Sequence, residues 1–487
     1  MKRINAFSLT LVASSLFCYS SFSIAQSMSI EQVLQRSIDN SISLKIASLQ
    51  TERATHEKVK IESMLGWQIT NQTNFNHDVG FTGTPSNVFR SVSGVNRMLK
   101  NGDIVGSSAN YSLEDSEFVF SPAFPNPAHR VNLDLNYRKP LWRDANNPSY
   151  SIGLTSADLG TKLTIENTSI IKDQFAAQVI ETYYITLLTQ AGIHNIQRAT
   201  TRTKRLIKFI KKNQQLGLAE EKDLLQVNAQ LQTLVAEQSS LELAWVQQQV
   251  LINNFMGRDH RAEFSPTLTS KFHALPTNEN TLLQEAIKHA PAIRLKNAQI
   301  ELAETTMARI RNSKKNKLDA IASLGTRSAY GKNSSNGTVN EHDYAVSIGI
   351  DFSRSLDKRG IDAEIQQAML DRSIALQEIE NIKRELKYSV LGFRQEISST
   401  NTAISAYKKR VKKEKQKLEE ASERYRRGRT DTQQLILFEN DLSTAEFLLE
   451  QKRIDLARRY ARLDLLRGKT WEKVIPLSAS NEGVQEQ

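Results

Sequence analysis

The feature of this sequence that most constrains its fold is a pair of matching apolar seams that lie 211 residues apart. Ten positions within 224–255, spaced by three and four residues, carry eight apolar side chains, and the matching ten within 435–466 also carry eight. A period sustained near 3.5 residues is typical of a coiled-coil seam. Gly217 and Gly428 precede the two seams at equivalent positions. The pattern predicts an internal duplication that contains two long helical hairpins.

The duplication extends upstream and predicts the same order of elements in each repeat: a first helix, two strands, a long helix, a glycine turn and a seam helix. The two long helices each span roughly 60 residues, or about 90 Å. Proline is absent from 149–265 and from 292–475, which suits long helices because a proline costs ~3 kcal/mol inside a helix. The expected elements are 29–64, 66–77, 131–142, 154–213 and 220–256 in the first repeat, and 281–316, 318–330, 343–353, 363–424 and 431–467 in the second.

These elements predict a division of the chain into five parts. We expect a signal peptide at 1–25, a first structural repeat at 26–258 and an inter-repeat linker at 259–280. A second structural repeat at 281–469 and a polar C-terminal tail at 470–487 follow. The first repeat is longer because about forty extra residues lie between its strands, and we expect 78–130 to form a surface loop.

The first 25 residues read as a secretory signal peptide. Lys2 and Arg3 give a basic start, an apolar stretch follows, and Ser23-Ile24-Ala25 fits a cleavage site with small residues. The alternative reading, a membrane anchor, is disfavoured because the apolar run is short for a span. The only cysteine, Cys18, lies in this segment. The sequence therefore predicts an exported chain whose mature form has no thiol.

The predicted strands have about the length that a tilted strand needs to cross a bilayer, ~9–11 residues. An open sheet edge leaves backbone groups without partners in lipid, so membrane strands close into barrels. Four strands in one chain are too few to close around a pore. We therefore expect several chains to combine their strands in the outer membrane while their polar helices project into the periplasm.

With this order of elements, the chain resembles the TolC-like outer-membrane efflux proteins over nearly all of 29–469. The resemblance implies an α+β membrane protein whose homotrimer forms a twelve-stranded barrel above a periplasmic tunnel of antiparallel coiled-coil helices. It implies passive export of small molecules or proteins, as part of a tripartite efflux or type I secretion system. The implied partners are a periplasmic adaptor, an inner-membrane transporter (ABC or proton-driven) and outer-membrane lipid. Besides the duplicated order, it rests on Leu216-Gly217-Leu218 with Asp223, on Tyr425 before Gly428, on the closing Gly257 and Gly468, and on Lys139-Pro140-Leu141-Trp142-Arg143.

The resemblance also implies roles for residues at the helix turns. It places adaptor docking at Gly217, Leu218, Gly428 and Arg429. It places a gate or latch at Asp223, Tyr425, Thr430, Gln434 and Leu437.

The sequence departs from the family pattern within this gate. Well-known family members carry two acidic residues at the positions of Gln434 and Leu437, so an acidic ring is not expected here. Thr430 occupies the position of an arginine that can tether to Asp223 in the family, and Arg427 or Arg429 is the candidate cation instead.

Other classes of function have little support in the sequence. It contains no HExxH, GxSxG or phosphate-loop motif, and its eight histidines are scattered without ligand spacing. We therefore expect no catalytic, metal or cofactor site, and no enzyme. Nucleic-acid binding is disfavoured despite a net charge of +11, because the chain is expected to be exported. The main alternative to a channel is a trimeric surface scaffold or adhesin without transport activity, and an exported hydrolase is a more distant one.

Overall fold

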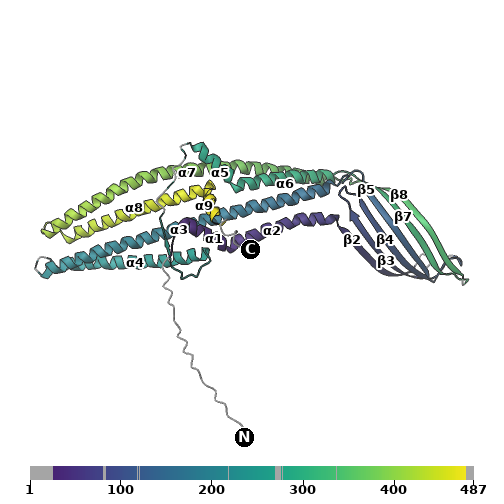
Figure 1. The fold of residues 1–487 in the computed structure, drawn as a ribbon, viewed down its shortest axis with the longest axis horizontal. Helices are drawn as coiled ribbons and strands as arrows, with labels where there is room; N and C mark the ends of the chain where they lie inside the picture. Colours follow the sequence, from purple (N-terminus) through teal and green to yellow (C-terminus); the bar gives the residue numbers. More distant parts are fainter. Residues whose placement is uncertain are drawn as a thin grey trace, which may run out of the picture.

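The computed structural model shows an elongated molecule with a β-sheet at one end and long helices running away from it (Figure 1). The expected signal peptide and Cys18 lie outside the described residues, and so does Leu218 at the first predicted turn. The described residues are 26–79, 84–117, 119, 121–215, 217, 219–268, 272, 276, 278–335 and 337–478.

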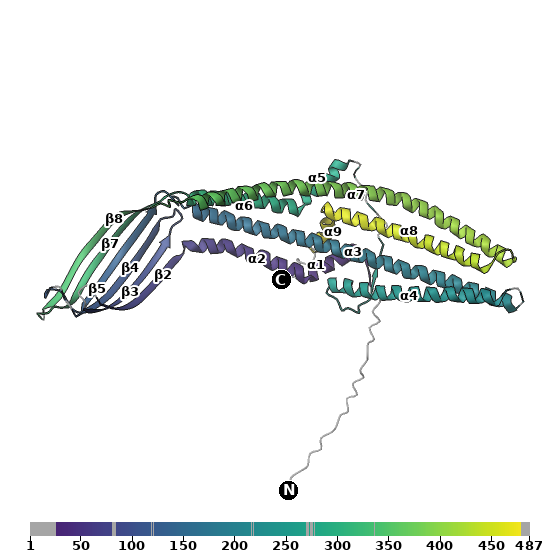
Figure 2. The same cartoon turned by 180° about the vertical axis from the view of Figure 1, so that it is seen from behind.

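Two helices of 68 residues, α3 (Pro148–Gln215) and α7 (Arg359–Arg426), run from the sheet to the far end of the molecule. At 1.5 Å per residue each is about 100 Å long. Each turns back at its far end into a helix of 35 residues, α4 (Glu221–Phe255) and α8 (Thr432–Leu466). The helices α3 with α4 and α7 with α8 therefore form two hairpins, as the seams predict, and their tips lie far from the sheet (Figure 2).

Shorter helices cover the half of α3 and α7 that lies near the sheet. The first helix expected in each repeat is interrupted, at Ser41 in one case and at Ala290 in the other. Ser41 caps the second piece because its hydroxyl accepts a hydrogen bond from the backbone N–H of Leu44, and a proline begins the corresponding piece in the other repeat, where its missing N–H costs nothing. The pieces are α1 (Ile30–Asn40), α2 (Ile42–Glu62), α5 (Glu279–His289) and α6 (Pro291–Ser313).

Six antiparallel strands form one sheet in the order β2-β3-β4-β5-β7-β8. The strands β2 and β8 are its two edges. Every strand has 13 to 16 residues, which exceeds the ~9–11 needed for a tilted crossing of a bilayer. The strands are β2 (Trp67–Val79), β3 (Pro85–Met98), β4 (Ile104–Ser116), β5 (Ala128–Pro140), β7 (Lys317–Lys332) and β8 (Thr338–Ser353).

The expectation of four strands and of a surface loop over 78–130 is wrong. Most of that segment forms the hairpin β3–β4, which lies within the sheet between β2 and β5. The sequence did not predict β3 because its apolar residues do not alternate regularly: Val88 and Val92 face one side of the sheet, while Phe89 and Val95 face the other. The expected barrel of twelve strands relied on four strands per chain and loses its basis.

The largest hydrophobic core lies midway along the molecule, where a pair of short strands packs against the helices. Strand β1 (Gln26–Met28) pairs in parallel with β6 (Phe264–Pro266), which lies in the expected linker. Tyr183 of α3 is fully buried there, and its hydroxyl lies 2.9 Å from the carbonyl oxygen of Met28 and 2.7 Å from that of Thr267.

The expected C-terminal tail also contributes to this core, so that prediction is wrong for its first part. Residues Lys469–Ser478 form helix α9. The indole Nε1 of Trp471 donates to Asp173 Oδ1 at 2.8 Å, and Lys172 Nζ lies 4.3 Å from the centre of the same ring. One aromatic side chain thus fixes α9 to α3, a contact that composition does not reveal.

Candidate functional site: the hairpin tips and the two faces of the sheet

Glycine makes both hairpin turns possible. Gly217 and Gly428 have φ angles of +75° and +69°, in the region that side chains other than glycine's rarely adopt. No atom lies within 4 Å of a Cβ built at either position, so the backbone conformation and not crowding requires glycine. Both glycines and Arg429 are exposed. The described part of the predicted docking surface is therefore accessible in the single chain.

Of the predicted latch residues, Asp223 and Tyr425 each make side-chain hydrogen bonds within their own hairpins. The carboxylate of Asp223 accepts the backbone N–H of Glu220 at 3.2 Å and so caps α4. The hydroxyl of Tyr425 lies 3.0 Å from that of Thr432, which is buried at the start of α8. Within the part of the chain that the structure describes, Asp223 has no ion pair with Arg427 or Arg429. The expected latch between these groups is absent from this conformation.

The remaining predicted gate residues lie in the turn of the second hairpin and at the start of α8. Thr430 and Gln434 hydrogen-bond to each other through their side chains. The backbone N–H of Gln434 donates to Asp431 Oδ1 at 2.8 Å, which caps α8. Leu437 is 55% exposed. These residues shape the tip of one hairpin, and the structure does not join them to the other.

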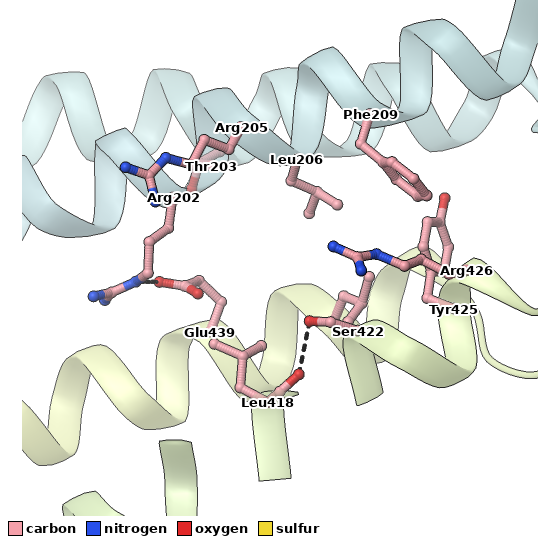
Figure 3. Close-up of a pocket in the computed structure, with 11 residues that line it drawn as sticks. Arg202, Thr203, Arg205, Leu206, Phe209, Leu418, Ser422, Tyr425, Arg426 and Glu439 are labelled. Atoms are coloured by element: carbon pink, nitrogen blue, oxygen red, sulfur yellow. Dashed lines mark hydrogen bonds and ion pairs between the residues drawn. The ribbon is translucent and has the colours of Figure 1, made fainter. Parts of the chain in front are cut away.

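A different set of charges joins the two hairpins. Arg202 of α3 donates to Glu439 of α8 (Figure 3), and its Nη1 also lies 3.4 Å from Glu446 Oε2. Arg198, one turn earlier, lies 3.7 Å from the same carboxylate of Glu446. The side chain of Glu439 is only 12% exposed and that of Arg202 24%. We call Arg202, Glu439 and Glu446 the hairpin clasp.

An apolar contact closer to the tips supports the clasp. The rings of Phe209 on α3 and Tyr425 on α7 pack in a tilted arrangement with centroids 5.8 Å apart. Between them and Arg202 lies a cavity of about 260 Å³, which Leu206 and Leu435 also line (Figure 3). The hairpins thus meet around a space that lies next to an apolar cluster, which includes Leu206 and Tyr425.

Burial changes the proton affinity of two groups at this contact. Burial raises the pKa of the Glu439 carboxyl, and the hydrogen bond and charge of Arg202 offset the rise only in part, while Glu446 adds to it. Burial likewise raises the pKa of the Tyr425 hydroxyl, against the lowering effect of Thr432. Keeping Glu439 charged in this buried place therefore costs free energy. This penalty weakens the contact between the hairpins, which suits a contact that can be released.

The sequence did not predict the hairpin clasp, because Arg198 and Arg202 are two of many basic residues in this part of the chain. One signal was present: Glu439 and Glu446 are seven residues apart and share a position in the heptad of α8. Which helix would face them is a tertiary question that the pattern of one helix does not answer.

The two faces of the large sheet differ in chemistry. On β8, Tyr344, Val346, Ile348, Ile350 and Phe352 alternate toward one face and are 58% to 86% exposed. We call this side the apolar face.

The opposite side of the sheet, which we call the charged face, bears ion pairs between strands. Arg327 Nη1 lies 2.7 Å from Asp134 Oδ1, and Arg138 Nε lies 2.9 Å from Asp319 Oδ2. A sheet with one apolar and one charged face, and no helix packed on either face (Figures 1 and 2), suits a boundary between lipid and water.

Membrane-spanning helices and clusters of metal-binding side chains are both absent from the described residues. None of the described helices combines the length and the apolar character that a membrane span requires. The described side chains also include no group of three or more His, Cys, Asp or Glu arranged to hold a metal ion.

Solved structures that this chain resembles include outer-membrane channels. Neither a family model nor a curated protein matches the sequence. Among solved structures, the outer-membrane channel OprN is 16% identical with a TM-score of 0.66, and the match covers 90% of this chain and 89% of that one. The Campylobacter jejuni CmeC outer membrane channel is 14% identical, with a TM-score of 0.65 over 92% of this chain and 89% of that chain. The open state of the Neisseria gonorrhoeae MtrE outer membrane channel is 14% identical, with a TM-score of 0.63 over 90% and 88%. The chain therefore has the helix-rich fold, with one antiparallel sheet, of the TolC-like outer-membrane efflux channels.

Proposed function

We propose that this protein is an outer-membrane channel that passively conducts small molecules or proteins out of the cell. The observation that carries the proposal is the sheet with one apolar and one charged face at the end of helices about 100 Å long. In the outer membrane the apolar face contacts lipid, the charged face lines water, and the helices extend into the periplasm. The likeness to channel structures supports the same arrangement.

The open edges of the sheet argue for assembly of several copies. Among the strands that the structure describes, β2 and β8 each have one side without a neighbour, and unpaired backbone groups are strongly disfavoured in lipid. Because six strands is an even number, β8 of one copy runs antiparallel to β2 of the next. We propose a homotrimer, in which each chain adds two helical hairpins to one tunnel.

The helix tips are the proposed site of contact with the rest of a tripartite efflux or type I secretion system. A periplasmic adaptor docks at the turns around Gly217 and Gly428, and an inner-membrane transporter supplies the energy. The hairpin clasp holds neighbouring hairpins together until the tunnel opens. No cofactor and no nucleic acid has a role in this scheme.

The proposal is tested by reconstituting the purified, detergent-solubilised protein in a planar bilayer. We expect discrete conductance steps, and we expect the protein to fractionate with outer-membrane markers in cells. A matched variant, Asp134→Asn, removes one charge from the charged face and should alter ion selectivity without abolishing insertion. Outer-membrane location without conductance under any condition would instead support the alternative of a surface scaffold or adhesin.

A further inference from the structure

We propose that the hairpin β3–β4 is part of the barrel wall, so that three copies close an eighteen-stranded barrel wide enough for hydrated polymeric cargo such as a polypeptide chain. This inference rests on the proposed function, and it concerns the size of the cargo that the exit admits. The alternative is that β3–β4 stands outside the membrane as an appendage on a barrel of twelve strands.

The register of the sheet is continuous through the inserted hairpin. Strand β3 pairs with β2 from Trp67 opposite Arg97 to Val79 opposite Pro85, which is the whole of β2. Strand β4 pairs with β5 from Ile104 opposite Arg138 onward. Strands β2 and β5 have no direct pairing, so the barrel cannot close without the hairpin unless the sheet is rebuilt.

The turn of this hairpin is fixed at the junction between the sheet and the long helices. Gly102 has a φ of +87°, and a Cβ built on it lies 3.1 Å from Asn147 Cβ, so the turn packs closely on the connection into α3. Asp103 is 6% exposed and accepts a hydrogen bond from the hydroxyl of Tyr137 on β5 at 2.7 Å. An appendage would not need its turn buried at this end of the sheet.

Aromatic side chains form a row on the apolar face that passes through the hairpin. Phe75 on β2 lies opposite Phe89 on β3, whose ring centroid is 6.1 Å from that of Tyr111 on β4. The hydroxyl of Tyr111 lies 2.9 Å from Nδ1 of His129 on β5, which stacks on Tyr330 of β7 at 4.9 Å. Rows of aromatic side chains mark the membrane interface of outer-membrane barrels. The hairpin supplies two members of this row.

Polar groups of the hairpin on the apolar face are paired with polar side chains of β2. Asn71 Nδ2 donates to Ser93 Oγ at 2.7 Å, and the hydroxyls of Thr73 and Ser91 lie 3.0 Å apart. Pairing lowers the cost of placing such groups beside lipid.

The charged face also continues across the hairpin. Arg90 Nε donates to Asn110 Oδ1 at 3.3 Å between β3 and β4, and Glu114 of β4 pairs with Arg130 of β5. Polar and charged contacts between neighbouring strands thus continue across the hairpin on this face.

The strand number sets the width of the exit. For strands about 4.8 Å apart and tilted by about 40°, closure gives a backbone radius of about 18 Å with eighteen strands and about 12 Å with twelve. Allowing about 5 Å for inward side chains on each side leaves a lumen about 26 Å across instead of about 14 Å. Barrels of sixteen to eighteen strands in other membrane proteins hold an aqueous channel. The wider exit admits hydrated polymers that the narrower one excludes.

Cysteine labelling tests whether β3 lies in the membrane wall. The only natural cysteine, Cys18, lies in the expected signal peptide, so single cysteines report cleanly. In liposomes, we expect Val92→Cys on the charged face to react with a membrane-impermeant maleimide and the neighbouring Val95→Cys on the apolar face to be protected. Equal labelling of both would overturn the proposal, whether or not the protein conducts.

Polymer exclusion tests the width independently. Neutral polymers about 20 Å in diameter, added on the exterior side, should lower the conductance of the full chain because they enter a lumen about 26 Å wide. Deleting 85–116 leaves β2 able to pair antiparallel with β5, and the same polymers should then have no effect. An identical cutoff in both proteins would contradict the proposal. Should the deletion variant fail to fold, exclusion of these polymers by the full chain would overturn it equally. Absence of any conductance would refute the proposed function, while the labelling result would still decide the place of the hairpin.

Discussion

Removing the cation of the hairpin clasp, in the variant Arg202→Ala, should loosen the contact between the two hairpins. Arg202 donates to Glu439 and contacts Glu446 at 3.4 Å, and both carboxylates are largely shielded from water. Breaking a buried ion pair by removing one partner costs about 3–5 kcal/mol. The cost is smaller here because Arg198 still reaches Glu446 at 3.7 Å, and because Glu439 can take up a proton. We therefore expect about 2 kcal/mol, or about a 30-fold shift toward separated hairpins.

Pulsed electron paramagnetic resonance measures this shift directly. Spin labels at Lys208 on α3 and Gln433 on α8, both exposed, report the distance between the hairpins. We expect a longer-distance population to grow in Arg202→Ala, together with a higher open probability in bilayer recordings.

The matched control for this experiment is Lys204→Ala, which removes an exposed positive charge on the same helix. The charge-swapped pair Arg202→Glu with Glu439→Arg should restore the shorter distance. Distances in Arg202→Ala that match those in Lys204→Ala would refute the assignment of the clasp.

Three further outcomes follow from the structure. Because burial raises the pKa of Glu439 above its ordinary value of 4.5, the closed hairpin contact should be more stable below that value and weaken as the pH rises through the raised pKa. The spin-label distances should show this pH dependence, and Glu439→Gln should abolish it. Gly428→Val places a β-branched side chain at a φ of +69° and should lower the free energy of unfolding by about 1–3 kcal/mol. The control Gly392→Ala, at an exposed position within α7, should stabilise the protein slightly. Equal melting temperatures for the two variants would contradict the strain argument. Tyr183→Phe removes the buried hydrogen bonds from its hydroxyl to the carbonyl oxygens of Met28 and Thr267 and should cost about 1–3 kcal/mol. The loss should appear as faster amide exchange in β1 and β6, while Tyr388→Phe, 73% exposed, should change little.

The helical half of the molecule was largely predictable because its signals are local and repeated. The seams and the glycines at 217 and 428 gave both hairpins, since a glycine at positive φ ends a helix wherever it occurs. The contact between hairpins was not predictable, because it depends on how α3 packs against α8. Arg202 resembles every other basic residue on its helix until Glu439 lies beside it.

The sheet also contains both strands that the sequence predicts and strands that it does not. Strand β8 was predictable, because Val346, Ile348 and Ile350 alternate with small or acidic residues. Strand β3 was not, because apolar side chains fall on both of its faces and serines dilute each pattern. Strand β4 did carry a usable signal in Ala109, Tyr111 and Leu113, which alternate with polar residues. The pairing of a weakly patterned strand is set by its neighbours in the sheet, and comparison with the second repeat, which lacks this hairpin, favours reading it as a loop.

Electron cryo-microscopy of the full-length protein in lipid nanodiscs tests the central claim most directly. We expect a particle with threefold symmetry, in which lipid surrounds a closed barrel of eighteen strands and the helices form a single rod below it. A stable monomer in detergent-free solution, with lipid absent from the apolar face of its sheet, would contradict the account.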